Sequence, residues 1–259
     1  MSMQTENHRG RILREHFGIV AEPGQYIIAL AGNPNVGKST VFNALTGLRQ
    51  HTGNWPGKTV DNAQGSFTYS NKPFLLVDLP GTYSILAHSV EEQVARDFIC
   101  FGQPDATLIV LDATCLERNL NLALQVMEIT PNVIVCVNLM DEAKKKHIII
   151  DIPALEKELG VPVVATAARK NEGLGTLRET LYQVSTGVRQ CSPRQLVYSP
   201  AVEMAVEQLV PTIQRLIDHK LNPRWVALRL LDGDTAFIES IKRHLDLQFK
   251  NALQEVATV

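Results

Sequence analysis

The chain has 259 residues, 45% of them apolar and 20% charged, and its 25 basic and 27 acidic residues give a formal charge of −2. This near balance argues against a surface that neutralises nucleic-acid phosphates, so we expect no nucleic-acid partner. No apolar run approaches the roughly 18–20 residues that cross a bilayer, and no apolar segment near the N-terminus suits a secretory signal. We therefore expect a soluble globular protein with a sizeable core.

The four cysteines are Cys100, Cys115, Cys136 and Cys191, and none belongs to a C-x-x-C pair that would indicate zinc or redox chemistry. Four cysteines could form two disulfides, but the composition favours free thiols in a reducing cytosol. The seven histidines likewise show no pair at metal-ligand spacing.

Residues 1–24 are polar and end in the turn signal Glu22-Pro23-Gly24, so we expect a leader with little structure or a short helix. Strand-like and helix-like segments alternate after it. Apolar and alternating runs predict six strands, at 26–31, 63–70, 74–81, 106–113, 132–138 and 162–168. Helical spacing predicts helices at 39–47, 89–100 (with Ser89 as N-cap), 116–130, 141–146 and 176–185, whereas 48–61 is expected to be a long loop.

This alternation predicts an α/β fold, a mostly parallel six-stranded sheet with helices on both faces. Such sheets bind ligands outside the carboxyl ends of their strands, where the polar signature residues of this sequence fall. After residue 186 the strand-like runs stop. We therefore divide the chain into a leader (1–24), an α/β domain (25–186) and a small all-α helical domain (187–259).

The helical domain carries its own start and stop signals. Ser199-Pro200 is expected to begin a helix that Pro211 should kink or break. Asp234 is expected to cap a last helix that runs through Phe249.

The segment Gly32–Ser39 fits the pattern G-x-x-x-x-G-K-[ST] between a strand and a helix, which is the arrangement of a P-loop NTPase. Glycines let backbone N–H groups point at phosphate oxygens, and the helix adds the positive end of its dipole. Lys38 is predicted to reach the β- and γ-phosphates, and the Ser39 hydroxyl to bind Mg²⁺. The predicted phosphate-binding residues are Gly32, Asn33, Pro34, Asn35, Val36, Gly37, Lys38, Ser39 and Thr40.

Two later motifs indicate a guanine-nucleotide switch. In Asp78-Leu79-Pro80-Gly81, the aspartate can hold Mg²⁺ through a water and the glycine amide can sense the γ-phosphate. In Asn138-Leu139-Met140-Asp141, the aspartate can accept hydrogen bonds from the N1–H and 2-amino groups of guanine, donors that adenine lacks. Each motif is weak alone, but their order and strand context together predict GTP and GDP as ligands.

The segment between the first helix and the second strand is predicted to be a first switch. It holds Gly57 and Thr59, which we expect to contact the nucleotide. The Thr59 hydroxyl can close onto Mg²⁺ and its amide onto the γ-phosphate, and loss of that phosphate would release the loop. Thr52 is the competing candidate for this role.

The combined motifs resemble the translation-factor-like GTPases. The segments GNPNVGKST, HTGNWPGKTV, DLPGTYS and EEQVARDF resemble the N-terminal GTPase domain of FeoB, the bacterial ferrous iron transporter. The resemblance is strong over about residues 26–185 and weaker over the helical tail. It implies a Ras-like G domain, a location at the cytoplasmic face of the bacterial inner membrane, and a membrane transporter domain of the same full-length protein as partner. Whether the protein forms a homo-oligomer is left open by the sequence.

The base-binding loop departs from the family pattern. The usual small hydroxyl residue followed by Ala is replaced here by Ala167-Ala168. The Ala168 amide can still donate to guanine O6. We expect the missing hydroxyl at Ala167 to loosen the nucleotide and to speed its exchange.

The residue after the D-x-x-G motif is Thr82, where many small GTPases carry a Gln that orients the attacking water. Intrinsic hydrolysis is therefore expected to be slow. In similar GTPases an Asn at the position of Asn35 binds K⁺, helped by first-switch carbonyl groups that match Gly53 and Trp55. Such a cation would supply the charge of an arginine finger; the alternative is that Asn35 only braces the loop. The expected catalytic residues are Asn35, Lys38, Thr59 and Gly81.

Trp55 is an unusual residue for a polar loop, and it either packs over the nucleotide or anchors the loop to the body of the domain. The leading interpretation is a GTP-hydrolysing switch that controls ferrous iron uptake, with GTP or GDP, Mg²⁺ and K⁺ as ligands. The alternatives are an Era-like GTPase associated with the ribosome or RNA, and a GTP-gated interaction module with incidental hydrolysis.

Overall fold

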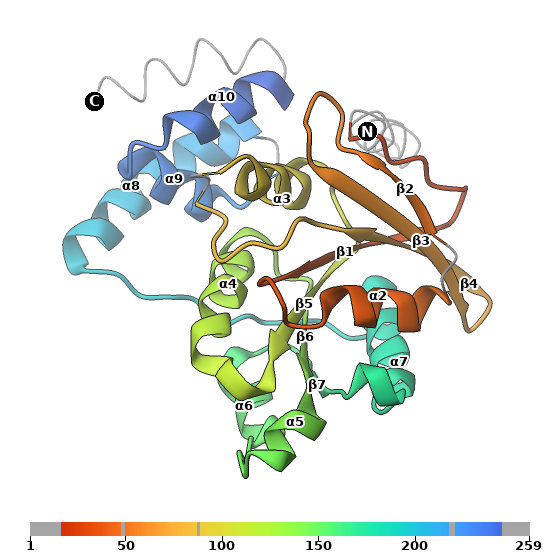
Figure 1. The fold of residues 1–259 in the computed structure, drawn as a ribbon. Coiled ribbons are helices and arrows are strands. Elements are labelled where there is room, and N and C mark those ends of the chain that lie inside the picture. The colour runs from red at the N-terminus through yellow and green to blue at the C-terminus, as the bar shows by residue number, and fades with distance from the viewer. Residues whose placement is uncertain (1–16, 48–49, 87–88, 218–220, 245–259) are drawn as a thin grey trace. The chain divides into compact units, whose positions relative to one another are not determined.

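The structure is a computed structural model that describes residues 17–47, 50–86, 89–217 and 221–244 (Figure 1). The chain divides into two compact units, Met1–Arg194 and Gln195–Val259. The first unit therefore extends beyond the expected boundary at residue 186. The backbone N–H groups of Ser192 and Arg194 explain this, because they donate to the carbonyl oxygens of Gly160 and Leu159 at 3.0 and 2.8 Å.

The first unit contains a seven-stranded sheet in the order β2-β3-β4-β1-β5-β6-β7. Strands β4, β1, β5, β6 and β7 run parallel, and β3 and β2 add antiparallel edges. The strands are β1 (Tyr26–Gly32), β2 (Gln50–Asn54), β3 (Asp61–Tyr69), β4 (Lys72–Asp78), β5 (Ala106–Asp112), β6 (Val133–Asn138) and β7 (Val163–Ala165).

The prediction of six strands is wrong, because the sheet has a seventh, the edge strand β2. This strand lies in the segment that is predicted to be a loop. Its sequence QHTGN has no apolar alternation, so the periodicity gave no signal. The strand forms because it pairs with β3 in the register Gln50↔Gly65 to Asn54↔Asp61, which satisfies its backbone groups.

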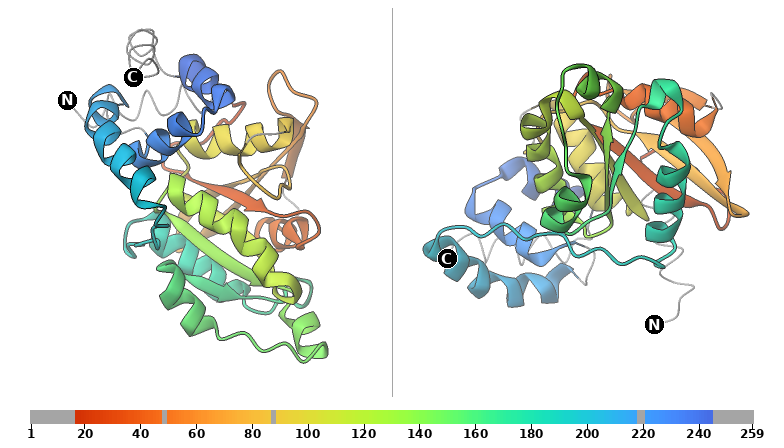
Figure 2. Two further views of the ribbon diagram at one scale, coloured as in Figure 1. Left: turned by 90° about the vertical axis from the view of Figure 1, so that its left-hand side faces the viewer. Right: turned by 90° about the horizontal axis from the view of Figure 1, so that it is seen from below.

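Helices cover both faces of the sheet (Figure 2). Helices α2 (Lys38–Thr46) and α7 (Leu174–Ser185) lie on one face, and α3 (Val90–Phe101), α4 (Leu116–Ile129) and α6 (Ile152–Leu159) lie on the other. The short α5 (Met140–Lys145) and the 3-10 turns η1 (Ala113–Cys115) and η2 (Ala168–Lys170) follow strand ends. The predicted cap of α3 is confirmed, since the Ser89 side chain accepts from the Glu92 N–H at 3.2 Å.

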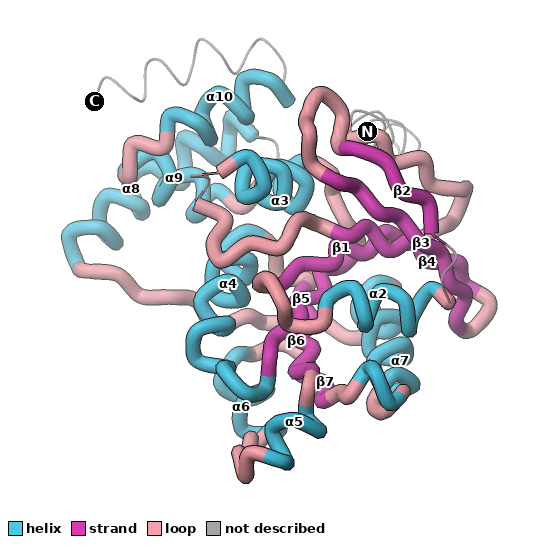
Figure 3. Tube along the Cα trace, in the orientation of Figure 1, coloured by secondary structure: helices cyan, strands magenta, loops and turns pink. Residues whose placement is uncertain are grey.

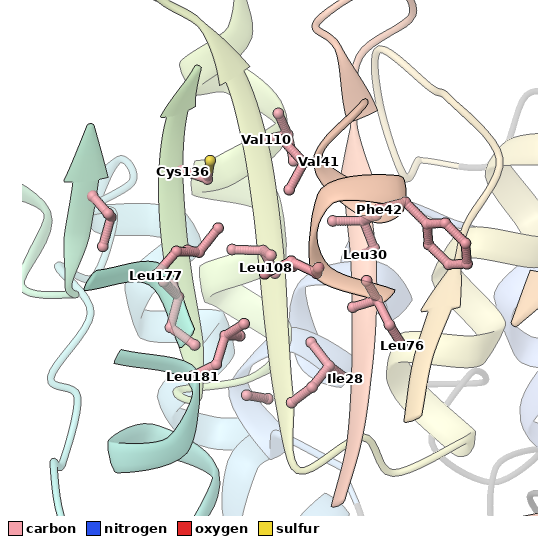
Figure 4. Close-up of a cluster of buried hydrophobic side chains, with 14 of the residues drawn as sticks. Ile28, Leu30, Val41, Phe42, Leu76, Leu108, Val110, Cys136, Leu177 and Leu181 are labelled. Atoms are coloured by element: carbon pink, nitrogen blue, oxygen red, sulfur yellow. The ribbon is translucent and has the colours of Figure 1, made fainter. Parts of the chain in front are cut away.

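An apolar core lies between the sheet and helices α2 and α7 (Figure 4). Ile28 and Leu30 from β1 meet Leu108 and Val110 from the neighbouring β5, and all four side chains are fully buried. Every second residue of each strand contributes, as expected of a strand whose side chains alternate between the faces. The apolar strands therefore hold the polar loops at their carboxyl ends in fixed positions.

The second unit is helical, with α8 (Pro200–Ile217), α9 (Pro223–Leu231) and α10 (Thr235–His244). The predicted break at Pro211 is wrong, because α8 continues through this residue. The Asp234 side chain accepts from the Phe237 N–H at 2.8 Å, as predicted, whereas the predicted end at Phe249 lies outside the described residues. Among the described residues, none of the helices combines the length and the hydropathy that crossing a bilayer requires.

Candidate nucleotide-binding site

The predicted phosphate-binding and base-binding residues lie at or just after the carboxyl ends of β1, β4, β6 and β7, which Figure 3 shows as strands followed by loops and helices. Because these strands are parallel, their carboxyl ends face the same side, and the loops that follow them meet there. Three interactions join the loops: Lys38 with Asp78, Asn138 with Val36, and Asn138 with Ala168. The separate sequence motifs therefore form one site.

The phosphate loop between β1 and α2 is shaped by two residues in left-handed conformations, Asn35 (φ 67°) and Gly37 (φ 83°). Gly37 also lies against Asn138, because a Cβ atom on Gly37 would be 2.5 Å from the Asn138 Nδ2 atom. Helix α2 begins at Lys38, so its free N–H groups face this loop. Asn35, Ser39 and Thr40 are exposed and accessible to a ligand.

Lys38 forms an ion pair with Asp78 at the end of β4. Burial raises the pKa of Asp78 above its ordinary value, and the positive charge of Lys38 opposes this rise. Asp78 and Ser39 both line a cleft of about 580 Å³. A carboxylate and a hydroxyl together are an oxygen donor set that suits Mg²⁺.

Asn138 is fully buried and uses its side chain to join three loops. Its Nδ2 atom donates to the Val36 carbonyl oxygen at 3.1 Å, and its Oδ1 atom accepts from the Thr166 hydroxyl at 3.0 Å and from the Ala168 N–H at 3.1 Å. The Ala168 amide, which was expected to donate to guanine O6, thus donates to Asn138 in this structure. Thr166 provides a hydroxyl one position before the expected one at Ala167.

Asp141 follows Leu139 and Met140 at the start of α5 and forms an ion pair of 3.2 Å with Lys170. Partial burial would raise the pKa of Asp141, but the Lys170 ammonium group and the backbone N–H groups of Asp141 and Glu142 together hold it below its ordinary value. The carboxylate is therefore ionised at neutral pH and can accept hydrogen bonds. The Lys170 contact was not expected from the sequence, because a single lysine carries no motif.

The first-switch segment is folded onto the edge of the sheet. Gly53 is part of β2 and pairs with Asn62, and the loop of residues 55–60 then returns the chain to β3. The Trp55 N–H donates to the Val60 carbonyl oxygen at 2.9 Å, and the Trp55 carbonyl oxygen accepts from the Lys58 N–H at 2.9 Å. The cleft lies between this hairpin and α2, and it is lined by Ser39, Phe42, Asn43, Thr52, Gly53, Asn54, Asp61, Asn62, Ala63 and Asp78.

Gly57 and Thr59 are exposed and do not line the cleft, whereas the competing candidate Thr52 does. The structure therefore does not bring Gly57 and Thr59 to the predicted phosphate and magnesium positions. Gly57 occupies a turn with φ 69°, which favours glycine.

Trp55 anchors the first switch to the body of the domain and is only 2% exposed. Its ring lies edge-on to Phe98 of α3 at 5.4 Å and to Phe17 at 6.3 Å, and the two phenylalanines are 5.6 Å apart. Gly18 lies against Pro56, since a Cβ atom there would be 3.3 Å from the Pro56 ring. Residues 17–18 thus cover the first switch, a contact that the expected unstructured leader did not predict.

The second-switch loop after β4 touches the phosphate loop. Gly81 packs against Pro34, with 3.5 Å between the position of a Gly81 Cβ atom and the Pro34 Cα atom. The Thr82 N–H donates to the Gly32 carbonyl oxygen at 3.3 Å. Gly81 is exposed and Thr82 is buried. Gly81 thus lies next to the predicted phosphate loop.

Comparison with protein families shows the family to which the chain belongs. Residues 26–181 match the family described as "Ferrous iron transport protein B", and residues 198–258 match the "FeoB cytosolic helical domain". The chain is 38% identical over 222 residues to the Fe(2+) transport protein A/Fe(2+) transporter FeoB fusion protein of Porphyromonas gingivalis, covering 83% of this chain and 26% of that protein. The chain spans about a quarter of the length of this relative.

Solved structures agree with the fold. The cytosolic domain of the FeoB iron transporter of T. maritima in apo form has a TM-score of 0.77 at 36% identity, over 90% of this chain and 94% of that chain. The same domain in GDP form I has a TM-score of 0.76 at 34% identity, over 92% and 95%. Its GMPPNP form has a TM-score of 0.75 at 34% identity, over 90% and 94%.

Proposed function

This chain belongs to the FeoB family, and from this premise we propose that it binds GTP and GDP, hydrolyses GTP, and regulates ferrous iron uptake by a longer protein. One observation carries the nucleotide proposal: Asn138 bonds to both Val36 of the phosphate loop and Ala168 of the base loop. A single buried side chain thus couples the two halves of a nucleotide site. The T. maritima structures with GDP and GMPPNP support the same ligand class here.

In the proposed complex, Lys38 leaves Asp78 and binds the β- and γ-phosphate oxygens. Asp78, through a water, and the Ser39 hydroxyl would then be the residues that hold Mg²⁺. This exchange of partners is reasonable because burial raises the pKa of Asp78, so a buried carboxylate that loses one cation benefits from another. Asp141, ionised at neutral pH, binds the guanine base.

Hydrolysis transfers the γ-phosphoryl group to water and leaves GDP. No Gln follows Gly81, so this chain must stabilise the developing negative charge in another way. Asn35 is exposed and held at φ 67°, with its side chain accessible beside the phosphates. We assign Asn35 to K⁺ binding with the Gly53 and Trp55 carbonyl oxygens; when bound, K⁺ supplies positive charge across the phosphates.

This assignment requires the first switch to move, since Gly53 lies in β2 and the Trp55 carbonyl oxygen is bonded to Lys58. The β2 arrangement buries two side-chain atoms, Trp55 Nε1 and Asn62 Oδ1, that have no hydrogen-bond partner within the described part of the chain. Each such atom costs about 1–3 kcal/mol, whereas an aromatic pair contributes about 0.5–1.5 kcal/mol. The unpartnered atoms reduce the stability of the β2 arrangement, so GTP can select a released arrangement that brings Thr59 to Mg²⁺.

The longer relatives are ferrous iron transporters, and this chain corresponds to about a quarter of the length of one of them. We propose that nucleotide state in this portion controls a membrane transporter domain of the same full-length protein, at the cytoplasmic face of the inner membrane.

The decisive experiment compares turnover of GTP and ATP by the purified chain in K⁺ and in Na⁺. The expected result is GTP turnover that rises at least tenfold in K⁺, with no ATP turnover. Asn35→Ala should abolish the stimulation. The matched control is Asn71→Ala in the β3–β4 turn, because Asn71 is also exposed and left-handed (φ 58°) but lies outside the site. Equal turnover in K⁺ and Na⁺ would overturn the cation assignment.

A GTP-gated interaction module is the second candidate, favoured by Thr82 at the position of the missing Gln. It predicts tight GTP binding with negligible turnover in either cation. The same assay therefore separates the two functions.

A further inference from the structure

Asn33, the second residue of the phosphate loop, is a buried amide without a hydrogen-bond partner. Its side chain is 2% exposed, and neither Oδ1 nor Nδ2 has a partner among the described residues. Burying a polar group in this way is unfavourable, and an apolar side chain would avoid the penalty. The residue therefore calls for an explanation beyond packing.

Asn33 lies where the phosphate loop meets the loop that follows β4. The residue before it, Gly32, accepts the Thr82 N–H at 3.3 Å, and the residue after it, Pro34, has its Cα atom 3.5 Å from the position that a Cβ atom on Gly81 would take. A distance of 3.3 Å is long for an N–H to carbonyl hydrogen bond, and Gly81 is exposed. The second-switch loop is thus joined to the phosphate loop at the residue before Asn33 by one long hydrogen bond.

We propose that Asn33 is a positioning residue for the second switch. When the γ-phosphate draws the Gly81 amide towards it, residues 81–82 shift and provide backbone partners for the Asn33 amide. The unpartnered Asn33 amide raises the free energy of the arrangement seen here. In the GTP-bound arrangement the amide gains hydrogen bonds, so it favours the state that hydrolyses GTP. This inference rests on the proposed GTPase function and assigns to Asn33 a role separate from the cation role of Asn35.

The chain offers a matched control in Thr107 of β5. Its hydroxyl is also fully buried and without a partner among the described residues, but it is part of the sheet interior rather than of a loop. Thr107→Val and Asn33→Ala each remove a buried unpartnered polar group. If such groups only reduce stability, both variants should melt at a higher temperature with unchanged turnover.

The experiment measures three quantities for wild type, Asn33→Ala, Asn33→Ser and Thr107→Val: melting temperature without nucleotide, GDP affinity by calorimetry, and GTP turnover. For Asn33→Ala we expect a melting temperature equal to or higher than that of wild type, GDP affinity within threefold, and turnover reduced at least tenfold. Asn33→Ser, which keeps one hydroxyl, should recover part of the turnover. Thr107→Val should gain stability and keep full turnover.

Hydrogen exchange of residues 79–86 gives a readout that does not depend on hydrolysis. GMPPNP should protect this segment in wild type and fail to do so in Asn33→Ala. Turnover within twofold of wild type, or unchanged GMPPNP protection, would overturn the role of Asn33. A joint fall in melting temperature, GDP affinity and turnover would also overturn it, by showing a packing role. Failure of wild type itself to bind guanine nucleotide would instead overturn the proposed function.

Discussion

The side-chain nitrogen of Asn138 donates a hydrogen bond of 3.1 Å to the carbonyl oxygen of Val36, which ties the end of β6 to the phosphate loop. The two residues are 102 positions apart in the sequence. Because Asn138 is fully buried, water does not compete for this bond. This hydrogen bond therefore fixes the predicted base-binding loop and the predicted phosphate loop relative to each other.

Gly37→Ala should disrupt the hydrogen bond between Asn138 and the phosphate loop. A Cβ atom at this position would be 2.5 Å from the Asn138 Nδ2 atom, and φ 83° is unfavourable for alanine. We expect GDP affinity to fall at least a hundredfold, measured by calorimetry. The control is Gly175→Ala in α7, where nothing lies within 4 Å of the new methyl group. That variant should keep its affinity and gain about 0.5–1 kcal/mol of stability. Equal GDP affinity in both variants would contradict the close contact.

Asp141→Asn should change base selectivity. In the proposed complex the carboxylate accepts from the guanine N1–H and 2-amino groups, whereas an amide presents a donor that suits the 2-oxo group of xanthine. Hydrogen bonds to a charged group contribute about 1.5–3 kcal/mol each, so loss of two should weaken GDP binding by roughly 10²–10⁴-fold. Xanthosine diphosphate should become the tighter ligand. Calorimetry with both nucleotides tests this, and unchanged preference for GDP would rule out Asp141 as the base reader.

Thr166→Val should speed GDP release. The Thr166 hydroxyl donates to Asn138 Oδ1 at 3.0 Å, and its removal leaves the buried amide oxygen with one partner fewer. A lost buried hydrogen bond of about 1–2 kcal/mol corresponds to roughly 5- to 30-fold faster dissociation. Ala167→Ser, which adds the hydroxyl usual in the family, should slow release. Stopped-flow release of a fluorescent GDP analogue measures both, and identical rates in the two variants would refute this view of the loop.

Stability should depend on pH through Asp78. Its pKa is raised by burial despite Lys38, so between the ordinary value of 3.8 and the raised value the folded state binds more protons than the unfolded state. The free energy of unfolding relative to Asp78→Asn should therefore fall as pH rises through this window and then stay constant. Lys38→Met should extend the window to higher pH. Urea unfolding of nucleotide-free protein tests this; a relative stability that rises with pH would show that Lys38 outweighs burial.

Phe17→Ala should favour release of the first switch, because Phe17 contacts both Trp55 and Phe98. In a Trp225→Phe background Trp55 is the remaining tryptophan, and its emission should shift to the red when GMPPNP and Mg²⁺ are added. Loss of a ring pair worth about 0.5–1.5 kcal/mol should raise the released fraction roughly 2- to 10-fold without nucleotide. Phe67→Ala, which removes a ring stacked on Phe74, is the control and should leave Trp55 emission unchanged.

The sequence predicted well those features that follow from local patterns. The buried runs of β1, β4, β5 and β6 are continuous in apolar residues, and Lys38, Asp78 and Asn138 follow strand ends at motif spacing. Because the strands are parallel, their carboxyl ends lie at the same edge of the sheet, and these residues meet there. The structure accordingly brings the predicted phosphate and base loops together.

Features that depend on tertiary contacts were not predictable in the same way. Strand β2 has no apolar period and exists because β3 offers backbone partners. The burial of Trp55 depends on Phe98, which is 43 positions away, and on Phe17, which was assigned to a leader. Gly57 and Thr59 are predicted site residues that the fold leaves outside the cleft, because residues 55–60 form the turn of a hairpin in this arrangement.

The position of β1 has a consequence for how the chain matures. Ile28 pairs with Leu76 on one side and with Ala106 on the other, so the first strand acquires both neighbours only after later residues have been synthesised. Pairing over such sequence distances is slow. In a nascent chain, Lys38 and the glycines of the predicted phosphate loop are therefore synthesised long before this loop reaches its folded conformation. A ligand that binds the finished fold alone then pulls this late assembly to completion by mass action.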